Sequence, residues 1–93
     1  MIFELKKTSQ FKASFKRARK RGLNISLLED IVEKLRTSQP LDKKHCNHEL
    51  SGNFKGIWEC HIQPDWLLLY YKDNDVLVLT LVDTGTHSDI FKK

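Results

Sequence analysis

Apolar and charged residues alternate over the first positions of the chain, and this alternation predicts a short strand. Phe3 and Leu5 alternate with charged residues, so the two kinds of side chain point to opposite faces of an extended segment. We therefore expect a strand over residues 2–6.

The pattern then changes to helical spacing, with a narrow apolar stripe and basic residues on the remaining faces. The stripe consists of Phe11, Phe15 and Ala18. Thr8 or Ser9 has a side chain that can cap the start of this helix. Gly22 is free to adopt positive φ, so we expect the helix to end there.

A second amphipathic pattern predicts another helix. Its apolar positions are Leu27, Leu28, Ile31, Val32 and Leu35. Ser26 and Glu29 have the spacing of a capping box, in which each side chain bonds the backbone N–H of the other residue. Pro40 is expected to stop the helix, because proline lacks the N–H that a helix needs.

Segments rich in β-forming residues, separated by turn residues, follow the second helix. We expect three strands, over Phe54–Gln63, Trp66–Lys72 and Val76–Val82. Residues 41–47 before them read as a loop, and residues 88–91 after them as a short turn or helix. The segment 73–75 is short enough to close a hairpin between the last two strands.

The order of elements is therefore β-α-α-β-β-β, which predicts an α+β fold. Two N-terminal helices are expected to pack on one face of a small, mainly antiparallel sheet. The 93 residues suffice for one modest core but not for two. We therefore expect residues 1–93 to form a single domain.

The composition, with 40% apolar and 30% charged residues, is ordinary for a soluble globular protein. No apolar run approaches the roughly 20 residues that span a bilayer, and the N-terminal charges follow the apolar residues, unlike those of a signal peptide. We expect a cytoplasmic protein with no membrane partner. In that reducing compartment Cys46 and Cys60 are expected to be free thiols.

Positive charge is concentrated at the N-terminus. Residues 1–22 carry eight Lys and Arg against one Glu, a net charge of +7, whereas the remaining residues carry −3. Such a block indicates a polyanion or an acidic partner, although a solvated helix face explains the charge alone equally well. The candidates for phosphate contacts are Lys12, Lys16, Arg17, Arg19 and Lys20.

Four histidines invite a metal interpretation, but their spacing does not favour it. They are His45, His48, His61 and His87. No pair of Cys or His has the separation of a zinc finger or of a helical HxxxH motif. We therefore expect no metal and no other cofactor.

General acid–base catalysis is the second interpretation of these residues. Glu59 and His61 are two residues apart on an expected strand, so they point the same way, and Asp65 follows at a strand break. RNA supplies its own nucleophile, the 2′-OH, so an enzyme that cuts it needs a base and an acid near neutral pH. His48, His61, Asp65 and His87 are candidates for these roles. Any one histidine taken alone is better explained as a solvated or hydrogen-bonded surface residue.

Two longer motifs carry a resemblance to a known family. The first, HELSGNFKGIWECHIQPDWLLLYY, runs from His48 to Tyr71, and the second, TGTHSDIF, runs from Thr84 to Phe91. Together they resemble the YafQ branch of the RelE/ParE toxin superfamily, and the resemblance extends over the whole chain.

The resemblance implies a toxin of a bacterial type II toxin–antitoxin module. Such toxins are ribosome-dependent mRNA endonucleases that cut the codon in the A site through 2′-OH attack, without a metal. It implies as partners the ribosome with its mRNA and a co-encoded antitoxin with an acidic segment. Operator DNA is implied as a partner only through the antitoxin.

The resemblance also assigns site residues. It places active-site histidines at His48, His61 and His87, and carboxylates at Glu59 and Asp65. Trp66 and Phe91 match the aromatic positions of the family. Either ring can stack on an RNA base or belong to the core, and Trp66 begins an apolar run that looks buried.

One position departs from the family pattern. The family usually has Arg immediately before the second motif, whereas this chain has Asp83. Either Lys55 or Lys72 replaces the missing cation in binding RNA, or the protein is an attenuated or inactive homologue that binds antitoxin as a regulatory module. A plain basic RNA-binding protein is a third possibility, but it leaves the histidines and carboxylates without a role.

Overall fold

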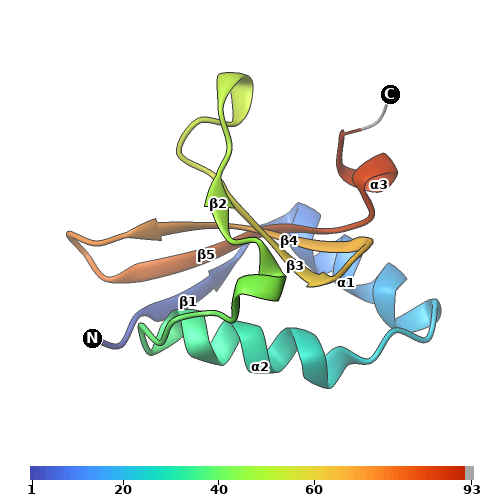
Figure 1. Ribbon diagram of the computed structural model, residues 1–93, viewed down its shortest axis with the longest axis horizontal. Coiled ribbons are helices and arrows are strands. Elements are labelled where there is room, and N and C mark those ends of the chain that lie inside the picture. The colour runs from blue at the N-terminus through green and yellow to red at the C-terminus, as the bar shows by residue number, and fades with distance from the viewer. Residues whose placement is uncertain (92–93) are drawn as a thin grey trace.

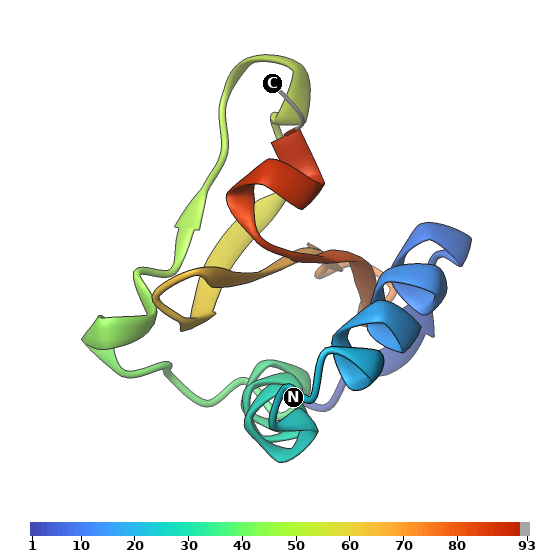
Figure 2. The same ribbon diagram turned by 90° about the vertical axis from the view of Figure 1, so that its right-hand side faces the viewer.

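The computed structural model describes residues 1–91, in which a five-stranded sheet carries two long helices on one face and a short helix on the other (Figure 1, Figure 2). The strands are β1 (Glu4–Lys7), β2 (His48–Glu49), β3 (Trp58–Gln63), β4 (Trp66–Asp73) and β5 (Val78–Gly85). The helices are α1 (Ser9–Lys20), α2 (Ile25–Arg36) and α3 (His87–Phe91), with short 3₁₀ turns η1 (Lys43–His45) and η2 (Gly52–Phe54). This is the predicted α+β fold.

The strands lie in the order β1-β5-β4-β3-β2. β1 pairs with β5 in parallel, and the other neighbours pair antiparallel. The helical hairpin of α1 and α2 thus connects the edge strand β1 to the opposite side of the sheet. β4 is the central strand, and its residues 66–70 are buried on both faces.

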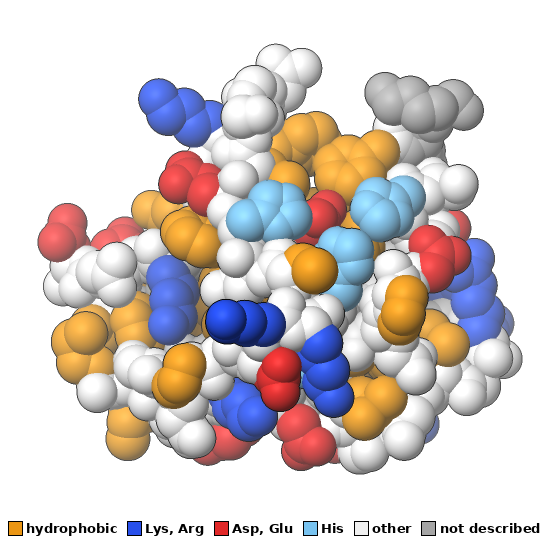
Figure 3. Space-filling model, viewed as in Figure 1, with side chains coloured by type: hydrophobic (Ala, Val, Ile, Leu, Met, Phe, Trp, Pro, Cys, Tyr) orange, Lys and Arg blue, Asp and Glu red, His pale blue; other side chains and the backbone are white. Residues whose placement is uncertain are grey.

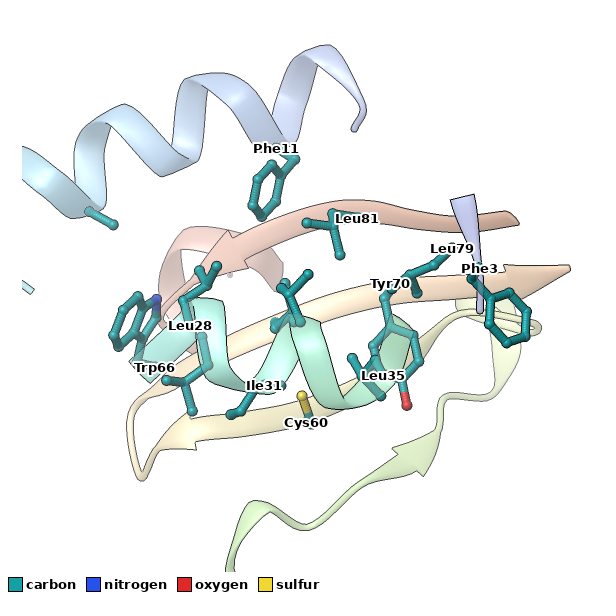
Figure 4. Packing of buried hydrophobic residues seen from close by; sticks show 14 residues of the cluster. Phe3, Phe11, Leu28, Ile31, Leu35, Cys60, Trp66, Tyr70, Leu79 and Leu81 are labelled. Carbon is teal, nitrogen blue, oxygen red and sulfur yellow. The ribbon is translucent and has the colours of Figure 1, made fainter. Parts of the chain in front are cut away.

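The main core lies between the two long helices and the sheet (Figure 4). Phe11 of α1 and the apolar face of α2 pack against side chains from the three longest strands. The sheet contributes Cys60, Ile62, Trp66, Leu68, Tyr70, Leu79 and Leu81. Leu67 and Leu69 alternate with these residues on β4 and are also buried, at 0% and 2% exposure. They therefore form the floor of the opposite face of the sheet.

The predicted capping box of the second helix is wrong. α2 begins at Ile25, one residue before the expected cap, and the Asn24 side chain accepts a hydrogen bond from the Ser26 N–H at 3.2 Å. Asn is as good a helix cap as Ser, so the polar residue that comes first in the chain takes the position. The Thr8 cap of α1 agrees with the prediction.

Strand boundaries differ from the predictions where turns are longer than expected. β3 starts at Trp58 rather than Phe54, because residues 52–56 form a turn with positive φ at Gly52 and Gly56. β5 starts at Val78 rather than Val76, because the Asp73 carboxylate accepts the N–H groups of two turn residues and Leu77 has a φ of 55°. The short strand β2 was not predicted.

No helix in residues 1–91 is long and apolar enough to cross a membrane. Both cysteines are free, with Cys46 exposed and Cys60 in the core. Burial raises the pKa of the Cys60 thiol to about 12, so this thiol is held in its neutral form at neutral pH.

Candidate active site

The candidate catalytic side chains gather on the sheet face that α1 and α2 leave uncovered. Glu59 and His61 project from β3 on this face, while Cys60 between them points into the helix-side core. β2 pairs with β3 so that His48 lies opposite Glu59. Figure 3 shows histidine side chains grouped around an acidic side chain between β2 and α3.

Glu59 is the centre of the group. Its carboxylate is only 5% exposed, and its Oε1 lies 3.4 Å from Nε2 of His48 and 3.5 Å from Nε2 of His61. The other ring nitrogen of His48, Nδ1, lies 2.6 Å from the Cys46 carbonyl oxygen. Both nitrogens of His48 therefore face oxygen atoms, a carboxylate on one side and a backbone carbonyl on the other.

His87, the first residue of α3, approaches the group from the end of β5. Its ring meets the ring of His61 edge-on at a centroid distance of 5.7 Å. Its Nδ1 lies 3.8 Å from Oδ1 of Asp65, a carboxylate whose side chain is 77% exposed. Three imidazoles and two carboxylates thus converge from four segments of the chain.

An aromatic pair borders the histidines. Phe91 stacks beside His87 at 6.1 Å and meets Phe54 edge-on at 5.3 Å. Phe54 is 38% exposed and was not among the predicted site residues. Its position between two glycines in the first motif was a signal for an aromatic side chain held on a turn.

The prediction that Trp66 stacks on RNA is wrong. The indole is 3% exposed, lies in the helix-side core, and donates its N–H to the Thr84 hydroxyl at 2.9 Å. No face of the ring is open to a base. Trp66 is a core residue, as its place at the start of an apolar run suggested.

The basic residues do not form one surface beside the histidines. Lys12, Lys16 and Arg19 line a groove between α1 and α2, on the helix side of the sheet. Arg17 instead lines a hollow with Asp65, on a different side of α1. Lys20 is exposed on α1, and Lys55 is exposed in the turn that carries Phe54.

Lys72 does not replace the missing family arginine. Its side chain lies on the helix face of β4, where Nζ sits 4.6 Å from the centre of the Phe3 ring and burial lowers the pKa of the amine. Asp83 pairs with Leu69, which pairs with Glu59, so Asp83 lies on the same sheet face as Glu59, two strand spacings or roughly 10 Å away. Of the two lysines named as substitutes, only Lys55 is still available.

The geometry also brings together possible metal ligands that are distant in sequence. Glu59, His61 and His87 each offer one ligand atom, and these atoms lie within 4.8 Å of one another. Imidazole nitrogen with carboxylate oxygen is a donor set that suits zinc and copper. The spacing of Cys and His along the sequence gave no metal-binding motif. That criterion detects only ligands close together in the chain, whereas these three come from β3 and α3.

The sequence of this chain is similar to those of known proteins. Residues 3–92 match the family model of the YafQ toxin, described as a bacterial toxin of type II toxin–antitoxin systems. The mRNA interferase toxin YafQ of Escherichia coli K12 is 33% identical over 89 residues, which cover 95% of each chain.

Solved structures agree in fold. YafQ in the E. coli DinJ–YafQ toxin–antitoxin complex has a TM-score of 0.88 at 28% identity, with 98% of this chain and 99% of that chain covered. A metal-bound toxin from Helicobacter pylori has a TM-score of 0.91 at 36% identity, covering 97% of this chain and 100% of that chain. The chain therefore belongs to the YafQ family of bacterial type II toxin–antitoxin toxins.

Proposed function

We propose that the protein is an endoribonuclease that cuts mRNA in the ribosomal A site by attack of the RNA's own 2′-OH, without a metal. The observation that carries the proposal is the convergence of His48, His61 and His87 on two carboxylates at an exposed face. The name of the E. coli relative, an mRNA interferase toxin, supports RNA cleavage as the activity.

The chemistry needs two proton transfers. His61 or His48, oriented by Glu59, takes the proton of the 2′-OH as the 2′-oxygen bonds to phosphorus. The bond from phosphorus to the 5′-oxygen then breaks, and the leaving oxygen takes a proton from His87. The products are a 2′,3′-cyclic phosphate and a 5′-OH. Asp65, at 3.8 Å from His87 Nδ1, orients the acid.

RNA contacts surround this centre. Phe91 and exposed Phe54 offer ring surface for a base next to the cleaved bond, and such stacking typically contributes about 1–3 kcal/mol per base. Lys55, the residue that follows Phe54 in the sequence, is the candidate for a contact with an RNA phosphate. The outer basic residues are proposed to hold ribosomal RNA without base specificity; they are Lys12, Lys16, Arg17, Arg19 and Lys20.

The proposed partner that silences the protein is a co-encoded antitoxin with an acidic segment. The DinJ–YafQ complex of E. coli supports an antitoxin partner, and charge complementarity with a basic toxin speeds association. Operator DNA is reached only through the antitoxin. Because ribosomes and mRNA are the targets, the proposed site of action is the cytoplasm.

An attenuated homologue that only binds antitoxin is not favoured. Asp83 is the one feature that suggested it, and the three histidines and two carboxylates of the proposed site are all present and brought together. With Asp83 on the same sheet face as the histidines, the proposal is that it lowers the rate of cleavage and does not abolish it.

Replacing His87 by Ala should lower the single-turnover cleavage rate by roughly 10²–10⁴-fold, because the general acid is lost. The side chain is half exposed, so the unfolding temperature should hardly change. Cleavage of mRNA on programmed ribosomes, with 5′-end mapping, measures the rate. An RNA with a 2′-deoxy group at the scissile nucleotide should resist the wild-type enzyme. Cleavage of that RNA, or full activity of His87→Ala, would contradict the mechanism.

Replacing Asp83 by Arg should raise the cleavage rate by about tenfold or more, since a charge contact to the transition state typically contributes a few kcal/mol. Asp83→Asn should give a smaller rise, because it removes the negative charge and keeps an acceptor for the Thr84 N–H. Asp75→Arg makes the same charge change in the β4–β5 turn, far from α3 (Figure 1). Equal effects of Asp83→Arg and this control would refute a local role.

Reversing the charge of Lys12, Lys16 and Arg19 together should weaken ribosome binding and flatten its salt dependence. Each lost phosphate contact should reduce the slope of log affinity against log salt by roughly 0.7–0.9. Binding measured from low to high salt gives the slope for the triple variant and the wild type. An unchanged slope would return these residues to a solvated helix face.

A chelator should leave the cleavage rate unchanged, because the proposed proton transfers use only side chains. Added Zn²⁺ or Cu²⁺ should slow the enzyme by binding Glu59, His61 and His87, since a ligated imidazole can no longer exchange protons. The measurement is the cleavage rate with EDTA, with Zn²⁺ and with Cu²⁺, each compared with the rate without additions. Loss of activity in EDTA that Zn²⁺ restores would establish a metal enzyme instead.

A further inference from the structure

The short helix α3 carries two residues of the candidate site but has little apolar anchoring of its own. It spans His87–Phe91, and none of its residues is buried. A helix of five residues is far below the length at which helices are stable in isolation. Something outside α3 must therefore hold His87 and Phe91 in place.

The Asp89 side chain provides the main polar connection of α3 in the described chain. Its Oδ2 accepts the N–H of Thr86 at 3.0 Å, and its own N–H donates to the Thr86 hydroxyl at 3.0 Å. This reciprocal pair is a capping box with Asp in the acidic position. It fixes the first turn of α3, which begins with His87.

The same carboxylate joins α3 to α1. Arg21, just after the C-terminal end of α1, donates to Oδ2 of Asp89 at 2.7 Å and to Oδ1 at 3.3 Å, and Arg17 lies 3.8 Å from Oδ1. A two-pronged guanidinium–carboxylate contact defines orientation as well as distance. Its two partners are 68 residues apart in the chain.

Close packing around Asp89 supports a built contact rather than a chance surface pair. The Asp89 side chain is 18% exposed. A Cβ atom added to Gly85 would lie 2.9 Å from the Asp89 Cβ, so only glycine lets the end of β5 approach this closely. The Arg21 hydrogen bond and the Thr86 N–H hold the pKa of the Asp89 carboxyl well below its usual range.

We propose that Asp89 is a positioning residue for catalysis: together with Arg21 it clamps α3 to α1 and so sets His87 opposite His61 and Asp65. The effect on the reaction rests on the proposed function, whereas the clamp itself does not. Arg21 and Arg17 then serve in part to hold the active site together, which explains why the basic block extends to the end of α1.

The experiment is a double-mutant cycle of Asp89→Asn and Arg21→Gln. Each single variant should lower the single-turnover cleavage rate by about 10- to 100-fold, because a misplacement of about 1 Å costs up to that much. Ribosome affinity should change far less. The double variant should be no slower than the slower single variant, since the two residues act through one contact. Asp30→Asn and Lys34→Gln make the same charge changes on α2 and should leave the rate unchanged.

Hydrogen exchange of the α3 backbone tests the clamp without any RNA. Both single variants should lose amide protection over residues 88–91, while β4 keeps its protection. In the wild type the folded pKa of Asp89 is depressed, so the contact is fully present above the ordinary carboxyl pKa of about 4 and is lost only as pH falls through the folded value. Protection of α3 should follow that pH dependence.

Two results would overturn the clamp. One is unchanged α3 protection in both single variants, and the other is additive losses of rate in the double variant. If the wild type cuts no RNA, the proposed function fails, and the exchange measurements still decide whether Asp89 and Arg21 hold α3.

Discussion

Burial of β4 on both faces is the constraint on which the rest of the structure depends. On one face Trp66, Leu68 and Tyr70 pack under α1 and α2, and on the other Leu67 and Leu69 lie beneath the candidate site. Over residues 66–70, which are all buried, the strand's polar groups have no water to bond. The Thr84 hydroxyl meets this need at the edge of the core, because it accepts from the Trp66 indole and donates to the Leu67 carbonyl. That junction lies directly before the chain leaves β5 for α3.

Burying the Glu59 carboxylate beside the apolar side chains of Leu67 and Leu69 is unfavourable in free energy. A carboxylate out of water must be paired or hydrogen-bonded, and here the partners are the rings of His48 and His61. His48 and Glu59 also lie opposite each other in the backbone pairing of β2 with β3. The contact of Glu59 with His48 and His61 therefore belongs both to the packing of the sheet and to the candidate site.

The distribution of charge follows from the two-sided sheet. Lys12, Lys16 and Arg19 lie on the helix side, whereas Arg17 and Arg21 reach the carboxylate that holds α3. The basic block of the sequence thus has two parts in the structure, an exposed groove on the helix side and a pair of arginines that contact Asp89. Asp83 adds negative charge to the face on which the proposed mechanism places the phosphate, and it lies in one row with Leu69 and Glu59.

The sequence by itself determined the fold class, the order of the main elements and the identity of the candidate catalytic residues. Periodicity reports which face of each element is apolar, and the two motifs name the histidines and carboxylates whatever their positions in space. The exact start of α2 and the turns before β3 and β5 were missed, because competing caps and positive-φ residues change the local energy by only about 1 kcal/mol. Only the tertiary structure decided that Trp66 is core, that Lys72 lies on the wrong face and that Phe54 borders the site. It alone joined Arg21 to Asp89, since contacts between residues far apart in the chain depend on how the elements pack, which periodicity does not encode.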